Sequence, residues 1–228
     1  MILITDAHVS VAHDNVEPFF QMLEKIKDYD DIIVFLGDIF DLWVSLPGYQ
    51  EECQRRFLEW CRERNQQKGV GFVEGNHEFF VVERNREAFS WSDGAGYESD
   101  GVLFVHGDLI NPDDKKYFLL RRVTKNPLTR TIVRFLPFGA RFAYYLKEKM
   151  KDANKEFKMG MPEAHIQNYA KQQFEAGHQH ILVGHFHQPY RVDGPDGRFL
   201  QILPDWFATQ FLSVYDGKDV RSLHWKEL

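Results

Sequence analysis

The sequence predicts an α/β fold in which two sheets pack against each other and are flanked by helices. Short apolar runs alternate with amphipathic segments through most of the chain, which is the pattern of β–α units. Beyond residue 190 short strands are separated by Gly-Pro-Asp-Gly and Asp-Gly turns, which is typical of antiparallel hairpins. The length of 228 residues fits one domain, so we expect residues 1–228 to form a single domain.

The predicted elements follow from the local pattern in chain order. Continuous apolar runs, as in strands covered on both faces, span 2–5, 32–36, 70–73, 102–105 and 181–183. Segments with helical spacing of apolar residues span 16–29, 49–68 and 162–176, with a further helix before the glycines at 94 and 96. Strands of the predicted antiparallel part span 190–192, 198–203, 211–215 and 221–225.

Residues 114–158 form a predicted helical insertion with breaks at Pro127 and at 137–139. Residues 115–158 hold 13 Lys and Arg residues but 3 acidic ones, whereas the rest of the chain holds 15 basic and 31 acidic residues. The insertion is also rich in Phe, Tyr and Leu. Its basic faces are either exposed to solvent or a binding surface for a phosphate-bearing, apolar or membrane-bound partner. The many aliphatic side chains argue against nucleic acid as that partner.

Five short motifs lie at the ends of predicted strands. They are Asp6-Ala7-His8, Gly37-Asp38, Gly75-Asn76-His77-Glu78, His106-Gly107-Asp108 and Gly184-His185-Phe186-His187. Residues two apart in an extended chain point the same way, so we expect Asp6 and His8 to reach one ion, and the His185–His187 pair to repeat that geometry. Ligands gather at the carboxyl ends of strands in α/β sheets.

Each motif alone is a weak signal, because an isolated His is more often a surface or core residue than a ligand. The five motifs together predict a metal site, because five unrelated motifs would not be expected to occur at strand ends in this order by coincidence. Mixed carboxylate, amide and imidazole ligands suit Mn²⁺, Fe²⁺ or Zn²⁺ better than Ca²⁺. We expect two divalent transition-metal ions, with Mn²⁺ preferred.

The order of the motifs resembles the calcineurin-like metallophosphoesterase superfamily over nearly the whole chain. The resemblance implies a four-layer αββα sandwich with a dinuclear centre. It assigns one ion to Asp6, His8, Asp38 and His187. It assigns the other ion to Asp38, Asn76, His106 and His185, with Asp38 as the bridge. His77 matches the catalytic histidine of that superfamily, with Asn76 beside it.

A narrower resemblance is to the bacterial UDP-2,3-diacylglucosamine pyrophosphatases of lipid A biosynthesis. Residues 37–43, GDIFDLW, are similar to that family's GD-[LI]-F-[ED]-x-W, and the stretch after His106 agrees in spacing. The resemblance implies cleavage to UMP and 2,3-diacylglucosamine 1-phosphate, with residues 114–158 as a lid over the acyl chains. The implied substrate-binding candidates are Asp114, Tyr117, Arg121, Arg141 and Lys149.

Two positions depart from this narrower family, which leaves open a calcineurin-like phosphodiesterase or phosphatase that acts on another phospho-substrate. The best-known members carry Arg where this chain has His77, and Ser where it has Asp152. A non-catalytic scaffold is a third class, which the full ligand set and His77 argue against.

Localisation is predicted from composition. Cys53 and Cys61 lie eight residues apart on one predicted helix, roughly 12 Å, which is too far for a disulfide and indicates a reducing compartment. The sequence has no apolar run of about 18 residues, so we expect no transmembrane helix. The basic, aromatic insertion predicts a cytoplasmic protein bound peripherally to the anionic inner face of the cell membrane.

Overall fold

Two mixed sheets form the centre of the structure, a computed structural model that describes residues 1–135 and 161–228. The six-stranded sheet has the order β13 (Val220–His224), β12 (Phe211–Tyr215), β1 (Ile2–Ile4), β2 (Ile33–Phe35), β4 (Val70–Val73) and β6 (Trp91–Asp93). The five-stranded sheet has the order β10 (Tyr190–Asp193), β11 (Phe199–Ile202), β9 (His180–Val183), β8 (Val102–Val105) and β7 (Gly96–Ser99). The strands that precede the five motifs, β1, β2, β4, β8 and β9, are parallel within their sheets.

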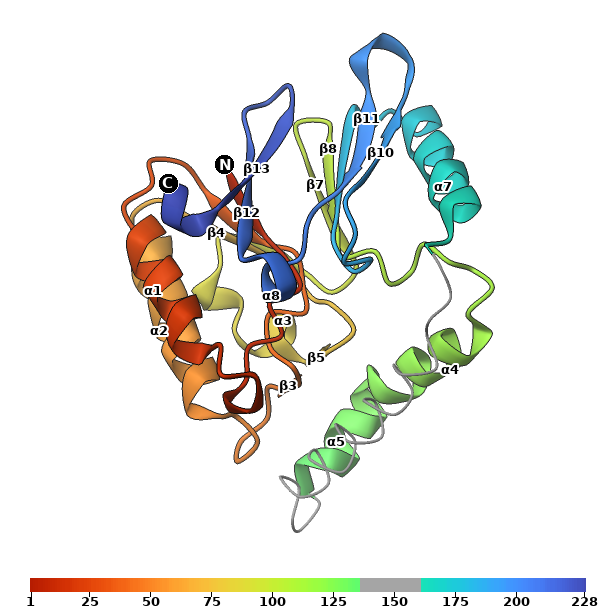
Figure 1. The fold of residues 1–228 in the computed structure, drawn as a ribbon. Coiled ribbons are helices and arrows are strands. Elements are labelled where there is room, and N and C mark those ends of the chain that lie inside the picture. The colour runs from red at the N-terminus through yellow and green to blue at the C-terminus, as the bar shows by residue number, and fades with distance from the viewer. Residues whose placement is uncertain (136–160) are drawn as a thin grey trace.

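Helices cover the outer face of each sheet (Figure 1). The helices α1 (Val16–Ile26) and α2 (Glu52–Asn65) pack on the six-stranded sheet, and α7 (Glu163–Glu175) packs on the five-stranded sheet. The layers therefore run helix, sheet, sheet, helix, which confirms the predicted four-layer α/β architecture.

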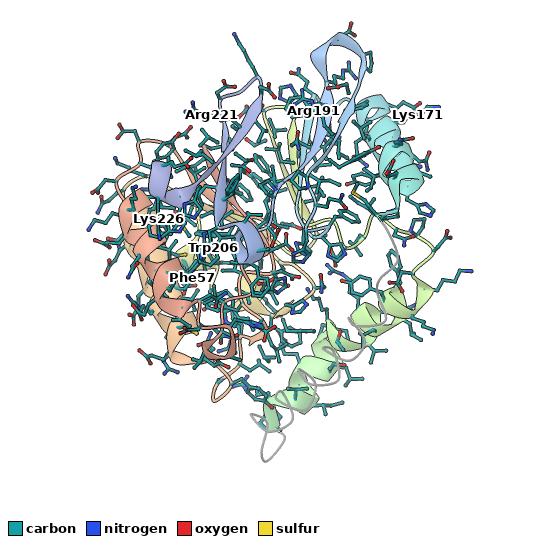
Figure 2. All side chains as sticks on the ribbon, in the orientation of Figure 1. Phe57, Lys171, Arg191, Trp206, Arg221 and Lys226 are labelled. Atoms are coloured by element: carbon teal, nitrogen blue, oxygen red, sulfur yellow. The ribbon has the colours of Figure 1, made fainter. Side chains whose placement is uncertain are left out.

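Alternation along the strands explains why their sequences are apolar throughout. In β1, Ile2 and Ile4 face α1 and α2, whereas Leu3 faces the second sheet. In β9, Leu182 faces the first sheet while its neighbours pack against α7. The central strands β1, β2 and β9 are thus covered on both faces, which explains why their sequences are apolar. Figure 2 shows Phe57 and Trp206 inside the body, with Lys171 and Arg221 at its margin.

Several elements differ from the sequence-based expectation. The helix predicted at 49–68 begins at Glu52, because Glu51 is extended and forms a capping box with Gln54. In the C-terminal part β11 pairs antiparallel with β10, as predicted, but its other edge pairs parallel with β9, which was not predicted. The helix expected before the glycines at 94 and 96 is α3 (Val81–Arg84), whereas β3 (Trp43–Val44), β5 (Glu78–Phe79), β6, β7 and α8 (Trp206–Thr209) were not predicted. Four short 3-10 turns complete the described chain, at Val11–His13, Arg86–Ala88, Pro195–Gly197 and Trp225–Glu227.

Two consecutive helices, α4 (Lys115–Thr124) and α5 (Pro127–Phe135), begin the predicted insertion and extend away from the sheets in Figure 1. Their junction lies at the break predicted for Pro127, and the Asn126 side chain accepts a hydrogen bond from the Thr129 amide at 2.9 Å. The remainder of the predicted 114–158 insertion, from residue 136 on, lies outside the described residues. Within the described ranges, every helix is too short or too polar to cross a bilayer.

Candidate active site

The five motifs lie together where the two sheets meet, each directly after the carboxyl end of its strand. The loops after β1, β2 and β4 come from the six-stranded sheet, and those after β8 and β9 come from the five-stranded sheet. The candidate site is thus built by both sheets, which the sequence pattern alone did not indicate.

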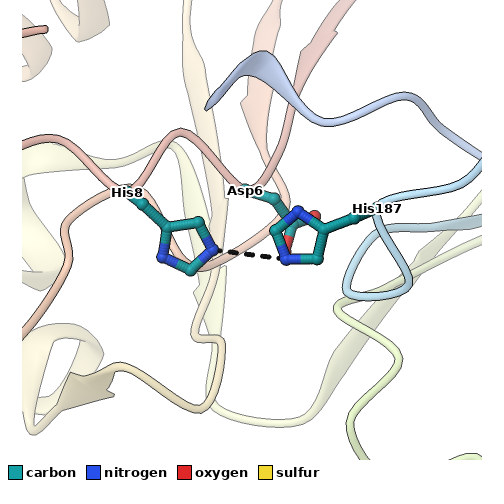
Figure 3. Close-up of side chains that lie close together, drawn as sticks. All are labelled: Asp6, His8 and His187. Carbon is teal, nitrogen blue, oxygen red and sulfur yellow. Dashed lines mark hydrogen bonds and ion pairs between the residues drawn. The ribbon is translucent and has the colours of Figure 1, made fainter. Parts of the chain in front are cut away.

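The first group of potential metal ligands is Asp6, His8 and His187 (Figure 3). The Nε2 atoms of His8 and His187 are 3.4 Å apart, and the His187 Nε2 is 3.7 Å from Asp6 Oδ1. All three residues offer ligand atoms within 4.8 Å of one another. One ion can therefore be reached by all three side chains.

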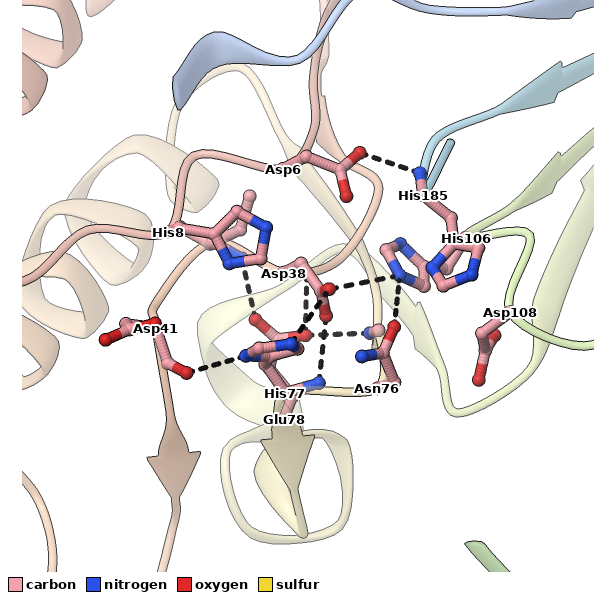
Figure 4. A network of polar contacts seen from close by, with 12 residues as sticks. Asp6, His8, Asp38, Asp41, Asn76, His77, Glu78, His106, Asp108 and His185 are labelled. Carbon is pink, nitrogen blue, oxygen red and sulfur yellow. Dashed lines mark hydrogen bonds and ion pairs between the residues drawn. The ribbon is translucent and has the colours of Figure 1, made fainter. Parts of the chain in front are cut away.

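The second group is Asp38, His106 and His185, and Asn76 adjoins it (Figure 4). The His106 Nε2 lies 3.4 Å from Asp38 Oδ2 and 3.0 Å from Asn76 Oδ1. The His185 amide donates to Asp6 Oδ2 at 2.7 Å, which links this group to the first. Every ligand predicted from the sequence thus falls in one of two adjacent groups.

His77 lies between the two groups and forms a third potential ligand set with His8 and Asp38. Its Nε2 is 3.8 Å from Asp38 Oδ2, and its backbone amide donates to Asp38 Oδ1 at 2.9 Å. Its Nδ1 lies 2.6 Å from the carbonyl oxygen of Asp41, which orients the ring so that Nε2 faces Asp38. The side chain is buried, so its position is fixed on both sides.

The backbone at the ligands is left-handed, and this corrects one expectation. The φ angles are +51° at Asp6, +41° at His8, +53° at Asp38, +71° at His185 and +54° at His187. The chain is therefore not extended at the i, i+2 pairs, and the ligands converge through tight turns instead. Left-handed φ is uncommon for residues other than Gly, and such strain concentrates at functional sites.

Burial and neighbouring charges shift the pKa values of Asp38 and of three site histidines. Burial alone would raise the pKa of Asp38, but the His77 and His106 imidazoles hold it well below its usual range. Burial lowers the pKa of His8 to about 3 and that of His185 to about 4, so both rings are neutral with a free nitrogen. Burial alone would also lower the pKa of His106, but the Asp38 carboxylate raises it to about 10. That value reflects a carboxylate-rich pocket that attracts positive charge.

The donor set fits divalent ions on two structural grounds. Among the described residues, Asp6 Oδ1 is a buried oxygen that receives no hydrogen bond, and a cation would satisfy it. The His106 Nδ1 lies 2.8 Å from the carbonyl oxygen of Leu36, to which it donates, so the ring is oriented with Nε2 toward Asp38 and Asn76. This second contact is the usual way in which a metal-binding His is oriented.

Glu78 connects the two loops that carry Asp38 and Asn76, and sequence reasoning gave it no role. Its Oε2 accepts from the amides of Asp38 and Gly75, each at 2.8 Å, and its Oε1 accepts from the amide of Ile39 at 2.7 Å. The side chain is fully buried. The position of Glu78 directly after Gly-Asn-His could have indicated a role at the site. Its hydrogen-bond partners 39 and 40 residues away could not be inferred from the sequence.

Close approach of the same two loops requires a residue without a side chain. A Cβ atom on Gly75 would lie 2.2 Å from Asp38 Oδ1, which is well inside van der Waals contact. Gly75 therefore allows the β4 loop to pass directly over the candidate bridging carboxylate.

The described candidates for substrate contacts lie on or next to α4, and their side chains form hydrogen bonds within the protein. The Asp114 side chain caps α4 by accepting from the Tyr117 amide at 2.9 Å. Tyr117 and Arg121 both donate to the buried Asp108, and Arg121 also donates to the Gly94 carbonyl at 2.6 Å. Arg141 and Lys149 lie outside the described residues. The sequence analysis missed Lys125, whose Nζ donates to the Gly75 carbonyl at 2.5 Å.

Comparison with known proteins gives one family match and several relatives. A family model described as calcineurin-like phosphoesterase matches residues 1–189. A Pseudomonas putida protein named UDP-2,3-diacylglucosamine hydrolase is 26% identical over 225 residues, which cover 90% of this chain and 90% of that protein. A protein of the same name from Aliivibrio fischeri is 23% identical, and the match covers 100% of this chain and 98% of that protein. The structure of a dimetal phosphatase from Danio rerio is 13% identical with a TM-score of 0.45, and the match covers 98% of each chain.

Replacing Glu78 by Gln should weaken divalent-metal binding about 10- to 100-fold, the usual cost of losing a residue that orients ligands. Gln keeps one accepting oxygen, but its amide nitrogen cannot accept, so at least one of the hydrogen bonds from the Asp38, Ile39 and Gly75 amides is lost. Mn²⁺ titration by calorimetry measures the change, with circular dichroism to verify the fold. Glu87→Gln, at an exposed ion pair with Arg62, is the control. Unchanged affinity in Glu78→Gln would contradict this role.

Proposed function

The chain belongs to the calcineurin-like phosphoesterase family, and on that premise we propose that it hydrolyses the pyrophosphate of UDP-2,3-diacylglucosamine. The products are UMP and 2,3-diacylglucosamine 1-phosphate. The observation that carries this proposal is the double group of Asp, Asn and His ligand atoms at the strand ends. Support for the substrate comes from relatives named for its hydrolysis, at 23–26% identity over most of the chain.

We assign two divalent ions to the site, Mn²⁺ in preference to Fe²⁺ or Zn²⁺. One would be held by Asp6, His8, Asp38 and His187, and the other by Asp38, Asn76, His106 and His185. Two such ions supply a nucleophilic water and neutralise charge on the phosphoryl oxygens. Asp38 is suited to bridge them because it lies between both histidine groups and its pKa is held low.

His77 is assigned to the reacting phosphate rather than to a metal. Its Nδ1 is engaged by the Asp41 carbonyl, so Nε2 is the atom that can meet the phosphoryl or leaving oxygen. A proton at that nitrogen stabilises the charge that builds up as the phosphorus–oxygen bond breaks. Asn76 acts beside it by placing an amide oxygen 3.0 Å from His106 Nε2.

The helices α4 and α5 form the described part of the proposed lid. Their exposed apolar side chains are Leu119, Leu120, Val123, Leu128, Ile132 and Phe135. The lid contacts the body through Val133, which packs near Phe80, and through the Arg121 and Lys125 contacts described above. An apolar surface with basic neighbours suits acyl chains and the anionic inner face of the cytoplasmic membrane.

A second candidate function is a phosphodiesterase or phosphatase that acts on another phospho-substrate. The observation that favours it is His77 itself, which occupies the position where the lipid A enzymes that this chain resembles carry Arg. Imidazole lacks the forked pair of donors with which Arg binds a phosphate. A site built on His77 therefore holds the phosphate differently from one built on Arg, which favours another phospho-substrate.

Purified protein loaded with Mn²⁺ should convert UDP-2,3-diacylglucosamine to UMP and the acylated sugar phosphate. Chromatography of the products measures the reaction, and ¹⁸O-water identifies the attacked phosphorus, which we expect to be that of UMP. Asp38→Ala is the negative control because it removes the shared ligand. Turnover of simple phosphodiesters without turnover of this substrate would favour the second candidate.

His77→Ala should lower kcat by about 10²–10³, because one contact to the developing charge is lost. Metal content should stay at the wild-type level, since the other ligands remain. Steady-state kinetics and metal analysis by mass spectrometry provide the two measurements, and His224→Ala on β13 is the control. Near-normal turnover in His77→Ala would remove this residue from the chemistry.

The protein should co-sediment with anionic liposomes and be released by salt, because each basic residue near such a surface adds about 1 kcal/mol. Replacing Leu128 and Ile132 by Ser should weaken the binding, since both side chains are exposed on α5. The control is Val11→Ser, at an exposed residue in the 3-10 turn of Val11–His13. Wild-type protein that stays in the supernatant at low salt would disprove membrane contact.

A further inference from the structure

The candidate site has two ends that differ in chemistry. Figure 4 shows His8 and Asp41 at one end and Asp108 at the other, with Asp38 between them. The Asp108 end is covered by α4, because Tyr117 and Arg121 both donate to Asp108. The His8 end is bordered by the short helix α8 and by the 3-10 turn of Val11–His13.

The helix α8 is attached directly to the loop that carries Asp6. The Trp206 amide donates to the Thr5 carbonyl and the Phe207 amide donates to the Asp6 carbonyl, both at 3.0 Å. Asp205 caps the helix by accepting from the Ala208 amide at 2.7 Å and lies 3.5 Å from His187 Nδ1. The position of α8 is therefore fixed relative to the ligands.

Two neighbouring aromatic residues on α8 have opposite environments. Trp206 is completely buried and fills the core beneath α1, whereas Phe207 is 41% exposed. The Phe207 ring meets the His13 ring at 4.9 Å and the His8 ring at 5.9 Å, edge to face in both cases. His13 in turn lies 3.6 Å from Asp41. We call Phe207 and His13 the Phe207 rim.

The exposed ring of Phe207 is not explained by packing of the core. Trp206 already supplies the large apolar side chain there, and an exposed Phe leaves apolar surface in water. Its backbone amide is bonded to a metal-ligand residue, so the ring is held beside the reacting centre with part of its surface open. A rigid aromatic ring of this kind suits a planar ligand that stacks on it.

We propose that the Phe207 rim binds the pyrimidine base of the nucleotide half of the substrate, an inference that rests on the proposed function. A pyrophosphate diester with a lipid on one side has two dissimilar halves. The flexible acyl half needs the apolar surface of α4 and α5, and of these two helices α4 covers the Asp108 end. The planar base then falls at the opposite end, where Phe207 offers a stacking surface and His13 offers a hydrogen-bonding nitrogen.

The test compares two ligands that share a ribose phosphate and differ in the base. Calorimetry on the Mn²⁺-loaded protein measures the Kd of UMP and of ribose 5-phosphate. The wild type should bind UMP about tenfold more tightly, the size expected for stacking of one base on an aromatic ring. Phe207→Ala should bind both ligands equally and ribose 5-phosphate as before, whereas Phe207→Trp should restore the preference.

The control is Phe211→Ala, since Phe211 is an exposed Phe on β12 that contacts His224 instead of the candidate ligands. It should keep the full preference for UMP. A wild type without preference, or a Phe207→Ala variant that retains it, would overturn the inference. In the substrate assay, Phe207→Ala should raise KM and leave kcat nearly unchanged, as for a group that binds ground and transition states alike.

Failure of the proposed function gives a different result. In that case the protein would leave UDP-2,3-diacylglucosamine intact, while UMP would still bind more tightly than ribose 5-phosphate in a Phe207-dependent way. That combination would keep the Phe207 rim as a base-binding subsite and assign the enzyme to another nucleotide ester.

Discussion

The buried carboxylate of Glu78 is the interaction on which the geometry of the site depends. It receives three backbone hydrogen bonds, from Asp38, Ile39 and Gly75, in a position without access to solvent. Burial and the nearby Asp38 charge raise the pKa of Glu78 to about 7, and the three backbone donors offset part of the cost of a negative charge there. The loops after β2 and β4 are thereby locked together, and these loops carry Asp38, Asn76 and His77.

The hydrogen bonds of Glu78 help to offset the cost of the left-handed backbone at the candidate ligands. Left-handed φ at a residue other than Gly costs of order 1–3 kcal/mol, and five candidate ligands adopt it. The opposing stabilisation is distributed: the Asp6 amide donates to Gly37 O and the His8 amide to Asp38 O, both at 3.0 Å. Beneath them the strands are buried on both faces. Burial of these strands stabilises the fold and so offsets the conformational cost of the left-handed loop residues.

The sequence predicted those features that are local and missed those that depend on distant partners. Strand ends at β1, β2, β4, β8 and β9 were visible because apolar runs stop where polar motifs begin. The division of these strands between two sheets was not visible, because register is set by pairing over long separations. The strand β6 reads Trp-Ser-Asp and lacks an apolar pattern, although it pairs with β4. The exposed Phe207 beside the buried Trp206 likewise depends on how α8 is attached to the Asp6 loop.

Attachment of α4 to the ligand loops couples the cover of the site to its chemistry. Lys125 donates to the carbonyl of Gly75, next to Asn76, and lies 3.6 Å from Glu74. Burial lowers the pKa of Lys125, so the Glu74 carboxylate is needed to keep the charge there. Arg121 holds Asp108, two residues after His106. The helix α4 is therefore attached to both ligand loops, through Lys125 at the loop after β4 and through Arg121 at the loop after β8.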